Sequence, residues 1–375
     1  MSGIYIHIPF CEKRCNYCDF FFTTNLKLIN NFLTALEKEI FLYSEQLKDI
    51  KFDSIYFGGG TPSLLSPEKI SSIITFIKNK FSIAENSEIT LEANPEDLLN
   101  KNISEYKSAG INRISLGIQS FNDEDLKFLT RNHTGADAEK VLSDCMGVFK
   151  NISADIIYSL PGQKFSDVKK SLDKIIAYKT PHISCYTLTF EERTVLYKDY
   201  LNKKIVKNDS ETESDLYLNL SKYLSDGGYE HYEVSSYSKP GFKAKHNSKY
   251  WTLENYLGLG PGAHSYLNKV RKNNVKNVSE YCKLLAEENL PLDELEKEKK
   301  SEGLTYKSEF IMLSLRSSGI NLNDYEEKFN ESFFEIHKEF IGSLVKNEYA
   351  LLNNEHLRLT DKGYALADEI TAKFL

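Results

Sequence analysis

This chain of 375 residues has few cysteines, no excess of positive charge and no long apolar run. Six cysteines are too few for a disulfide scaffold at this length. A net charge of −7 argues against a nucleic-acid-binding protein, which usually shows a basic face. No apolar run approaches the roughly 18 to 20 residues of a membrane span. The N-terminal stretch MSGIYIHIPFC lacks a secretory signal pattern. We therefore expect a cytoplasmic protein that binds no nucleic acid.

Three of the six cysteines are present within eight residues, in the stretch HIPFCEKRCNYCDF. They are Cys11, Cys15 and Cys18. In a reducing compartment, such a cluster indicates a metal or redox site. The other three cysteines are isolated, and we expect them to be buried core thiols: Cys145, Cys185 and Cys282.

Short β-branched runs alternate with helix-patterned segments over the first half of the chain. Strands are predicted at 4–8, 54–58, 88–93, 113–118, 154–160 and 182–188, with helices such as 29–47 and 67–81 between them. This alternation predicts βαβ units and an α/β fold with a parallel sheet. Six units predict a partial (β/α)6 barrel, since a closed eight-unit barrel takes about 250 residues. An open doubly wound sheet is the alternative.

The pattern loosens towards the C-terminus. A helix is predicted at 214–229, ending at Gly227-Gly228, and a strand-like stretch at 229–238. The charge-dense stretch 293–303 is interpreted as a solvated helix or linker, and we place a domain boundary beside it. Residues 1–290 then form the barrel domain, and residues 291–375 form a smaller, mainly helical domain. The stretch LRLTDKG (357–363) resembles the wing of a winged helix, and a plain helical cap is the alternative.

The three-cysteine loop directly follows the first predicted strand. In parallel α/β proteins, active sites form beyond the C-terminal ends of the strands. A structural zinc site needs four protein ligands, and His7 belongs to the strand itself. A [4Fe–4S] cluster normally takes four thiolates, so three thiolates leave one iron open to another ligand. The spacing therefore indicates a cluster with an open iron.

Further polar and glycine-rich positions follow the later strands. The turn GGGTP (58–62) ends the second strand, where glycine allows a ligand to approach the backbone closely. Glu92 ends the third strand and could accept hydrogen bonds from a ribose hydroxyl. Gln119, Arg131 and Asp155 lie at or just beyond later strands. Each of these residues could also have a purely structural role, as a tight turn, a helix cap or a surface side chain.

Cys-x3-Cys-x2-Cys after the first strand resembles the radical S-adenosylmethionine (SAM) superfamily. There the open iron chelates the amino and carboxylate groups of SAM, and an electron from the cluster cleaves SAM. The resemblance implies that Cys11, Cys15 and Cys18 hold a [4Fe–4S] cluster and that the barrel is a radical SAM barrel. It places a first SAM beside Tyr5, Gly59 and Glu92. A second SAM position would use Tyr17, Gly60, Thr61, Gln119, Arg131 and Asp155.

The segments YIHIPFC, GGGTP, LEANP, LGIQSF and IYSLPGQ together resemble the coproporphyrinogen dehydrogenase-like branch, over nearly the whole chain. The oxidases of this branch have an N-terminal extension and a further cysteine, giving CxxxCxxCxC. Here the first cysteine is residue 11, so no extension is expected, and Phe20 occupies the position of the further cysteine. Both departures match the haem chaperones of the branch, whose loop ends in CDF.

A second element resembles the HNxxYW signature of the haem chaperones. It consists of His246, Asn247, Tyr250 and Trp251, the last being the only tryptophan. Neutral imidazole is a common axial haem ligand, and aromatic rings offer flat faces to a porphyrin. We therefore predict that His246 ligates haem iron; a surface or hydrogen-bonded histidine is the alternative. The nearby GLGPGAH lacks the spacing of a dinucleotide-binding loop.

The resemblance implies a haem-trafficking protein that carries a [4Fe–4S] cluster, one or two SAM molecules and haem. We expect it to deliver haem to haem-requiring proteins such as respiratory-chain components, with peripheral membrane association, as a monomer or a cluster-dependent dimer. No residue is assigned a catalytic role. One alternative is an oxygen-independent coproporphyrinogen III dehydrogenase, and another is a radical SAM methyltransferase.

Overall fold

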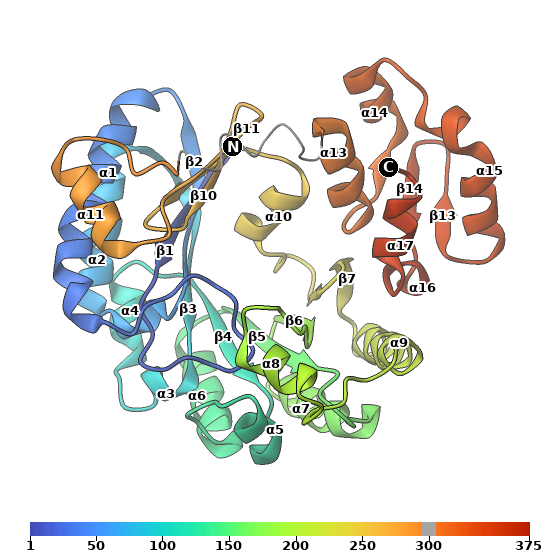
Figure 1. The fold of residues 1–375 in the computed structure, drawn as a ribbon, viewed down its shortest axis with the longest axis horizontal. Coiled ribbons are helices and arrows are strands. Elements are labelled where there is room, and N and C mark those ends of the chain that lie inside the picture. Colours follow the sequence, from blue (N-terminus) through green and yellow to red (C-terminus); the bar gives the residue numbers. More distant parts are fainter. Residues whose placement is uncertain (294–304) are drawn as a thin grey trace.

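The computed structural model describes residues 1–293 and 305–375 (Figure 1). From residue 294 onwards, the predicted charged connector lies outside the described residues. Eleven strands form one large sheet in the order β11-β10-β9-β1-β2-β3-β4-β5-β6-β8-β7. Within the described residues, no helix is both long and apolar enough to span a lipid bilayer.

Six parallel strands form the centre of this sheet. Their bounds are Ser2–Ile8 (β1), Lys51–Gly59 (β2), Ser82–Ala93 (β3), Arg113–Gln119 (β4), Asn151–Tyr158 (β5) and His182–Thr187 (β6). They lie side by side in chain order, whereas a doubly wound sheet reverses its order at a switch point. The predicted partial barrel of six βα units is therefore confirmed, and the open doubly wound sheet is excluded.

Helices cover the outer face of the curved sheet (Figure 1). They are Ile29–Gln46 (α1), Pro67–Lys80 (α2), Pro95–Leu98 (α3), Ile103–Ser108 (α4), Asp123–Phe128 (α5), Gly135–Val148 (α6) and Phe165–Ala177 (α7). Alternate strand residues such as Ile4, Ile6 and Ile8 are fully buried in the core beneath them. Each such side chain contributes about 1.5–3 kcal/mol by leaving water. The remaining alternate positions face the barrel interior.

The barrel interior is polar. Closed barrels usually fill this space with branched aliphatic side chains. Here Tyr56, Glu92, Ser115 and Asp155 line an internal cavity instead. Because side chains alternate between the two faces of a strand, these positions are polar while their sequence neighbours are apolar.

Short strands extend the sheet at both edges. The elements after β6 are Val195–Leu201 (α8), Ser210–Asp226 (α9), Glu230–Glu233 (β7), Ser236–Ser238 (β8), Lys245–Trp251 (α10), Tyr256–Leu259 (β9), His264–Leu267 (β10), Val270–Asn273 (β11) and Val278–Ala286 (α11). As predicted, α9 ends at the glycine pair, where Gly228 adopts a φ of 77°. Strand β8 pairs antiparallel with β6, and β9 pairs parallel with β1.

The C-terminal part forms a smaller domain. Its elements are Tyr306–Leu315 (α13), Ile320–Asn321 (β12), Leu322–Phe329 (α14), Phe333–Lys346 (α15), Ala350–Leu352 (β13), His356–Leu359 (β14), Asp361–Tyr364 (α16) and Ala367–Ala372 (α17). The three strands pair in the order β12-β14-β13, and the hairpin of β13 and β14 follows two helices, as in a winged helix. Arg358 Nη2 donates to the carbonyl of His231 (2.8 Å) and fixes this domain against the barrel side. The boundary at residues 290 and 291 stays a prediction.

Candidate cofactor site

The cysteine loop begins three residues after β1 and is closed at its base by backbone hydrogen bonds. The N–H of Thr23 donates to the carbonyl of Pro9 (2.6 Å), and the N–H of Cys11 donates to the carbonyl of Thr23 (3.0 Å). This clasp anchors the loop at the C-terminal end of the parallel strands. A rigid scaffold that holds a loop in this way is the usual arrangement of a functional site.

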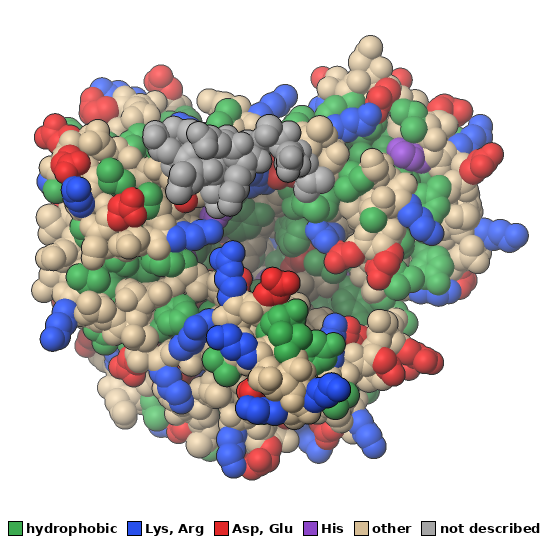
Figure 2. Space-filling view, in the orientation of Figure 1, with side chains coloured by type: hydrophobic (Ala, Val, Ile, Leu, Met, Phe, Trp, Pro, Cys, Tyr) green, Lys and Arg blue, Asp and Glu red, His purple; other side chains and the backbone are tan. Residues whose placement is uncertain are grey.

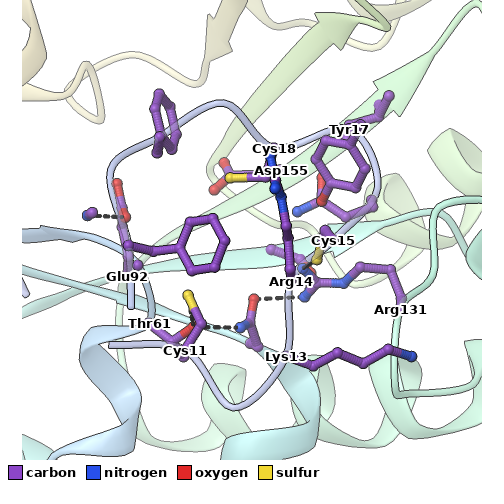
Figure 3. Close-up of a pocket in the computed structure, with 18 of the residues that line it drawn as sticks. Cys11, Lys13, Arg14, Cys15, Tyr17, Cys18, Thr61, Glu92, Arg131 and Asp155 are labelled. Carbon is purple, nitrogen blue, oxygen red and sulfur yellow. Dashed lines mark hydrogen bonds between the residues drawn. The ribbon is translucent and has the colours of Figure 1, made fainter. Parts of the chain in front are cut away.

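The three thiols turn towards one cavity of about 610 Å³ (Figure 3). All three cysteines are free and half-buried. Thr61 Oγ1 donates to the Sγ atom of Cys11 (3.5 Å), and Arg131 Nη1 donates to that of Cys15 (3.7 Å). Hydrogen bonds to a cysteine sulfur stabilise its thiolate and tune a metal centre that it ligates.

The donor set fits an iron–sulfur cluster better than a single metal ion. In the described parts of the chain, no three His, Cys, Asp or Glu side chains converge on one metal position. Structural zinc needs such convergence, whereas the thiolates of a cluster bind separate irons. Burial raises the pKa of Cys11 to about 11 and also raises that of Cys18. Cluster binding would therefore release thiol protons.

The glycine turn after β2 packs against the cysteine loop. Gly59 has a φ of 114°, and a Cβ there would lie 2.7 Å from the ring of His7. A Cβ on Gly60 would lie 2.7 Å from the carbonyl oxygen of Phe10 and 3.0 Å from the sulfur of Cys11. Only glycine therefore lets the two segments approach so closely, and the turn forms one wall of the cavity.

Glu92 lies in the cavity wall at the end of β3. Its carboxylate accepts hydrogen bonds from Tyr56 Oη (2.8 Å) and from the N–H of Gly59 (3.2 Å). Burial nevertheless raises its pKa to about 7, because desolvation outweighs these donors. Tyr5, which was predicted beside the same ligand, stacks behind Tyr56 with a centroid distance of 6.1 Å. Tyr5 is absent from the residues that line the cavity.

Gln119 and Asp155 lie in the cavity wall at neighbouring strands. Gln119 has a φ of 64°, and the β4–β5 register shifts between Gly117 and Gln119. The Gln119 amide folds back over Gly117, whose Cβ would lie 2.9 Å from Gln119 Nε2. Asp155 accepts hydrogen bonds from Ser115 Oγ (2.9 Å) and Ser153 Oγ (2.8 Å), while burial raises its pKa.

Arg131 connects the cysteine loop to the far wall of the cavity. Its side chain is only 5% exposed, and its Nη2 donates to Asn94 Oδ1 (2.5 Å) and lies 3.6 Å from Glu96. Its Nε has no hydrogen-bond partner among the described residues. A buried N–H without a partner is costly, and a ligand carboxylate would satisfy it.

The structure brings nearly all the residues predicted for SAM to this one cavity. Those that line it are Tyr17, Gly59, Gly60, Thr61, Glu92, Gln119, Arg131 and Asp155, together with the three cysteines. Sequence reasoning missed Tyr56, Asn94, Ser115 and Leu188. Ser115 occupies an alternate strand position before Gln119, so the two-residue period was the available signal.

The predicted haem segment lies in α10, outside the lining of this cavity, and His246 stacks on the cavity residue Tyr56 with 5.1 Å between ring centroids. His246 is fully buried, with Nδ1 3.0 Å from Ser54 Oγ and Nε2 2.9 Å from Tyr250 Oη. A Cβ on Gly3 would lie 2.9 Å from His246 Nδ1. Ile8, at the C-terminal end of β1, is five positions after Gly3 and therefore roughly 16 Å further along the strand, and the cysteine loop begins three residues beyond Ile8.

The other members of the haem segment are half-buried: Asn247, Tyr250 and Trp251. Tyr250 packs edge-on against Tyr256, with 4.7 Å between ring centroids. Both ring nitrogens of His246 are engaged, so it could ligate iron only by leaving Ser54 or Tyr250. Burial lowers the pKa of His246 to about 3, so the ring is neutral. The haem role of this segment stays a prediction.

A parallel partial barrel with CxxxCxxC after its first strand defines a radical SAM protein. The model of the radical SAM superfamily matches residues 5–175, and that of the HemN C-terminal domain matches residues 305–366. The solved coproporphyrinogen III oxidase (HemN) from Escherichia coli superposes with a TM-score of 0.80 at 20% identity. That match covers 100% of this chain and 90% of the oxidase chain, and it establishes the shared fold.

Curated relatives identify the family within the radical SAM proteins. The heme chaperone HemW of Lactococcus lactis is 34% identical, with 100% of this chain and 97% of the relative covered. That of Bacillus subtilis is 32% identical, with 100% and 99% covered. The mouse mitochondrial radical S-adenosyl methionine domain-containing protein 1 is 33% identical over 70% of this chain and 60% of its own length. The chain belongs to the HemW family of heme chaperones.

Proposed function

We propose that this protein binds haem and transfers it to haem-requiring proteins, with a [4Fe–4S] cluster and SAM held at the cysteine loop. The observation that carries this proposal is the similarity to heme chaperones along the entire chain, at 34% identity for the Lactococcus lactis relative. A fold shared with an oxidase at 20% identity would not by itself favour transport over oxidation.

The cavity residues have the chemistry that the cluster and SAM require. Cys11, Cys15 and Cys18 would hold the cluster, which supplies an electron and an open iron when bound. Glu92 can accept a hydrogen bond from a ligand hydroxyl, and the Arg131 guanidinium in the cavity wall, whose Nε has no partner among the described residues, would attract a ligand carboxylate. The cavity of about 610 Å³ is within the range of roughly 300–1,000 Å³ of small-molecule sites. A first SAM would use Gly59 and Glu92, with Tyr5 positioning Tyr56.

A second SAM is part of the proposal, because the cavity wall continues beyond the first position. Its candidate partners are Tyr17, Gly60, Thr61, Gln119, Arg131 and Asp155. Asp155 can accept a hydroxyl hydrogen bond, since its carboxylate is already oriented by Ser115 and Ser153. Occupancy by two molecules would be read directly as the stoichiometry of SAM bound to the reconstituted protein.

Porphyrinogen oxidation is the alternative activity. Phe20 supports the carrier, because it occupies the position where the oxidases have a further cysteine, and its side chain is 70% exposed at the cavity rim. An apolar ring at this position cannot replace the thiol that the oxidases have there. A methyltransferase is a further alternative that no specific contact in the cavity favours.

The haem recipients in our proposal are respiratory proteins, many of which lie in membranes. Peripheral membrane association is therefore part of the proposal.

Haem transfer is tested with the full chain, reconstituted anaerobically with iron and sulfide and loaded with haem. Haem-depleted b-type respiratory cytochrome in membranes is the acceptor, and apomyoglobin measures passive release. We expect the cytochrome to gain haem faster than apomyoglobin, which measures passive release. The Cys11→Ala variant provides the comparison with a protein that lacks the cluster. Equal rates to both acceptors would refute directed transfer. Absence of stoichiometric haem binding would refute the carrier function altogether.

A further inference from the structure

The surface of residues 193–207, which we call the α8 rim, combines exposed apolar side chains with positive charge. It contains α8 and the loop that follows it. Its inner side is anchored by Leu196 and Ile205, which pack in a small core together with Tyr17 of the cysteine loop. Its exposed apolar side chains are Val195, Tyr200, Leu201 and Val206. Removing apolar side chains from water is favourable, so this face is suited to contact with another molecule or surface.

The charge of the α8 rim is opposite to that of the whole chain, which has a net charge of −7. Five of its side chains are basic and one is acidic: Arg193, Lys198, Lys203, Lys204, Lys207 and Asp199. Lys204 is paired with Asp199 at 2.9 Å, and Lys207 is paired with Glu213 of α9 at 3.5 Å, so Arg193, Lys198 and Lys203 carry the positive charge of the rim. Two exposed acidic residues, Glu191 and Glu192, precede the segment and limit the positive surface on that side. Figure 2 shows apolar side chains with lysines and arginines around them over the part of the molecule where Figure 1 places α8.

The α8 rim is attached directly to the cysteine loop. The N–H of Leu196 donates to the carbonyl of Asn16 (2.9 Å), and Arg14 Nη2 donates to the carbonyl of Arg193 (2.8 Å). Phe20 lies on the same loop, exposed, and lines the cavity. A surface that docks on the α8 rim would therefore lie next to the cavity mouth.

We propose that the α8 rim docks this protein onto the surface of an anionic lipid bilayer. Aliphatic and tyrosine side chains insert at the level of the lipid head groups, while lysines on the same segment attract anionic lipids. This combination fits a bilayer better than an acidic soluble protein, which would need the lysines but not four exposed apolar side chains. The inference rests on the proposed function, since membrane-bound haem acceptors give the docking its purpose.

The test is co-sedimentation of the full chain with vesicles of phosphatidylcholine alone or with about 30% phosphatidylglycerol. We expect binding to the anionic vesicles, weakened at about 0.5 M salt, and little binding to the neutral ones. The double variant Leu201→Asp/Val206→Asp should bind anionic vesicles about tenfold more weakly. The double variant Lys198→Glu/Lys203→Glu should lose the preference for anionic lipid.

Leu351→Asp is the matched control, because Leu351 is 64% exposed in the C-terminal domain and Leu201 is 60% exposed in the α8 rim. It should bind vesicles like the unaltered chain. Equal vesicle binding by the Leu201→Asp/Val206→Asp variant would overturn the proposal, and so would loss of self-association in place of loss of vesicle binding. Haem titration of the unaltered chain without vesicles separates the two hypotheses. An unaltered chain that binds no haem refutes the carrier function, whereas one that binds haem but not anionic vesicles refutes only the docking surface.

Discussion

Ser54 and His246 are separated by 192 residues in the sequence and form a buried hydrogen bond of 3.0 Å at the N-terminal end of the barrel strands. The second ring nitrogen of His246 is 2.9 Å from Tyr250 Oη. The imidazole thus connects β2 to α10 in a position that Gly3 leaves open. The HNxxYW segment therefore has a structural role whether or not it also binds haem.

Replacing His246 should destabilise the protein even without haem. His246→Ala removes both hydrogen bonds and leaves a cavity, which should cost about 2–4 kcal/mol of unfolding free energy. Ser54→Ala removes one partner and should cost about 1 kcal/mol. Urea unfolding of the haem-free protein measures both. An unchanged midpoint for His246→Ala would show that the buried contacts do not support the fold, and any haem-binding defect of this variant must be corrected for stability.

The glycine turn can be tested through cluster incorporation. Gly60→Ala introduces a Cβ 2.7 Å from the carbonyl oxygen of Phe10 and 3.0 Å from the sulfur of Cys11. Accommodating it should cost about 1–3 kcal/mol and displace the first thiol. We expect lower iron content and a weaker cluster absorption band after reconstitution. Gly147→Ala is the control, because a Cβ there meets nothing within 4 Å, and its α-helix should gain about 1 kcal/mol. Equal iron content in both variants would argue against the close packing of turn and loop.

Glu39 predicts a pH dependence of stability far from the cysteines. Its carboxylate is fully buried and accepts hydrogen bonds from Tyr281 Oη (2.6 Å), Asn274 Nδ2 (2.6 Å) and the N–H of Gly260 (2.7 Å). Burial still raises its pKa to about 7, above an unfolded value near 4.5. The folded state therefore binds more protons between these values, and its stability falls as pH rises through that window.

A pKa shift of this size corresponds to a decrease in the unfolding free energy on the order of 3 kcal/mol as the pH rises from about 4.5 to 7. Glu39→Gln should remove this dependence, because the amide does not ionise. Unfolding free energies of the two proteins across the window give the comparison, in which the variant curve should be flatter. Parallel curves would mean that Glu39 is charged in the folded state throughout.

Glu92 predicts a pH dependence of SAM affinity. A charged carboxylate accepts a stronger hydrogen bond from a hydroxyl than a neutral one does. Since burial places the pKa of Glu92 at about 7, affinity should rise as pH increases through neutrality. Glu92→Gln should weaken binding about tenfold at pH above 7 and flatten the profile, by the loss of one charge-assisted hydrogen bond. Calorimetric titration of the reconstituted protein measures this, and an unaltered profile would place SAM away from Glu92.

Local periodicity was enough to predict the six strands, their parallel pairing and the cavity at their C-terminal ends. Residues at the ends of successive parallel strands necessarily meet, so Glu92, Gln119 and Asp155 could be brought together from the sequence. Tyr5, predicted beside the first SAM, stacks on Tyr56 outside the cavity lining, because its position depends on packing between strands; its contact with SAM stays a prediction. The depth of His246 depends on Gly3 and Ser54, which no local pattern connects to residue 246. The binding of Glu39 to Gly260 is equally non-local.

The central claim is that the cysteine loop serves a haem carrier and not a porphyrinogen oxidase. The most direct measurement incubates the reconstituted protein anaerobically with coproporphyrinogen III, SAM and a strong reductant, beside a titration of the same preparation with haem. Our account predicts stoichiometric haem binding, detected by visible absorption, and no protoporphyrinogen product. Formation of vinyl groups with consumption of SAM would contradict it.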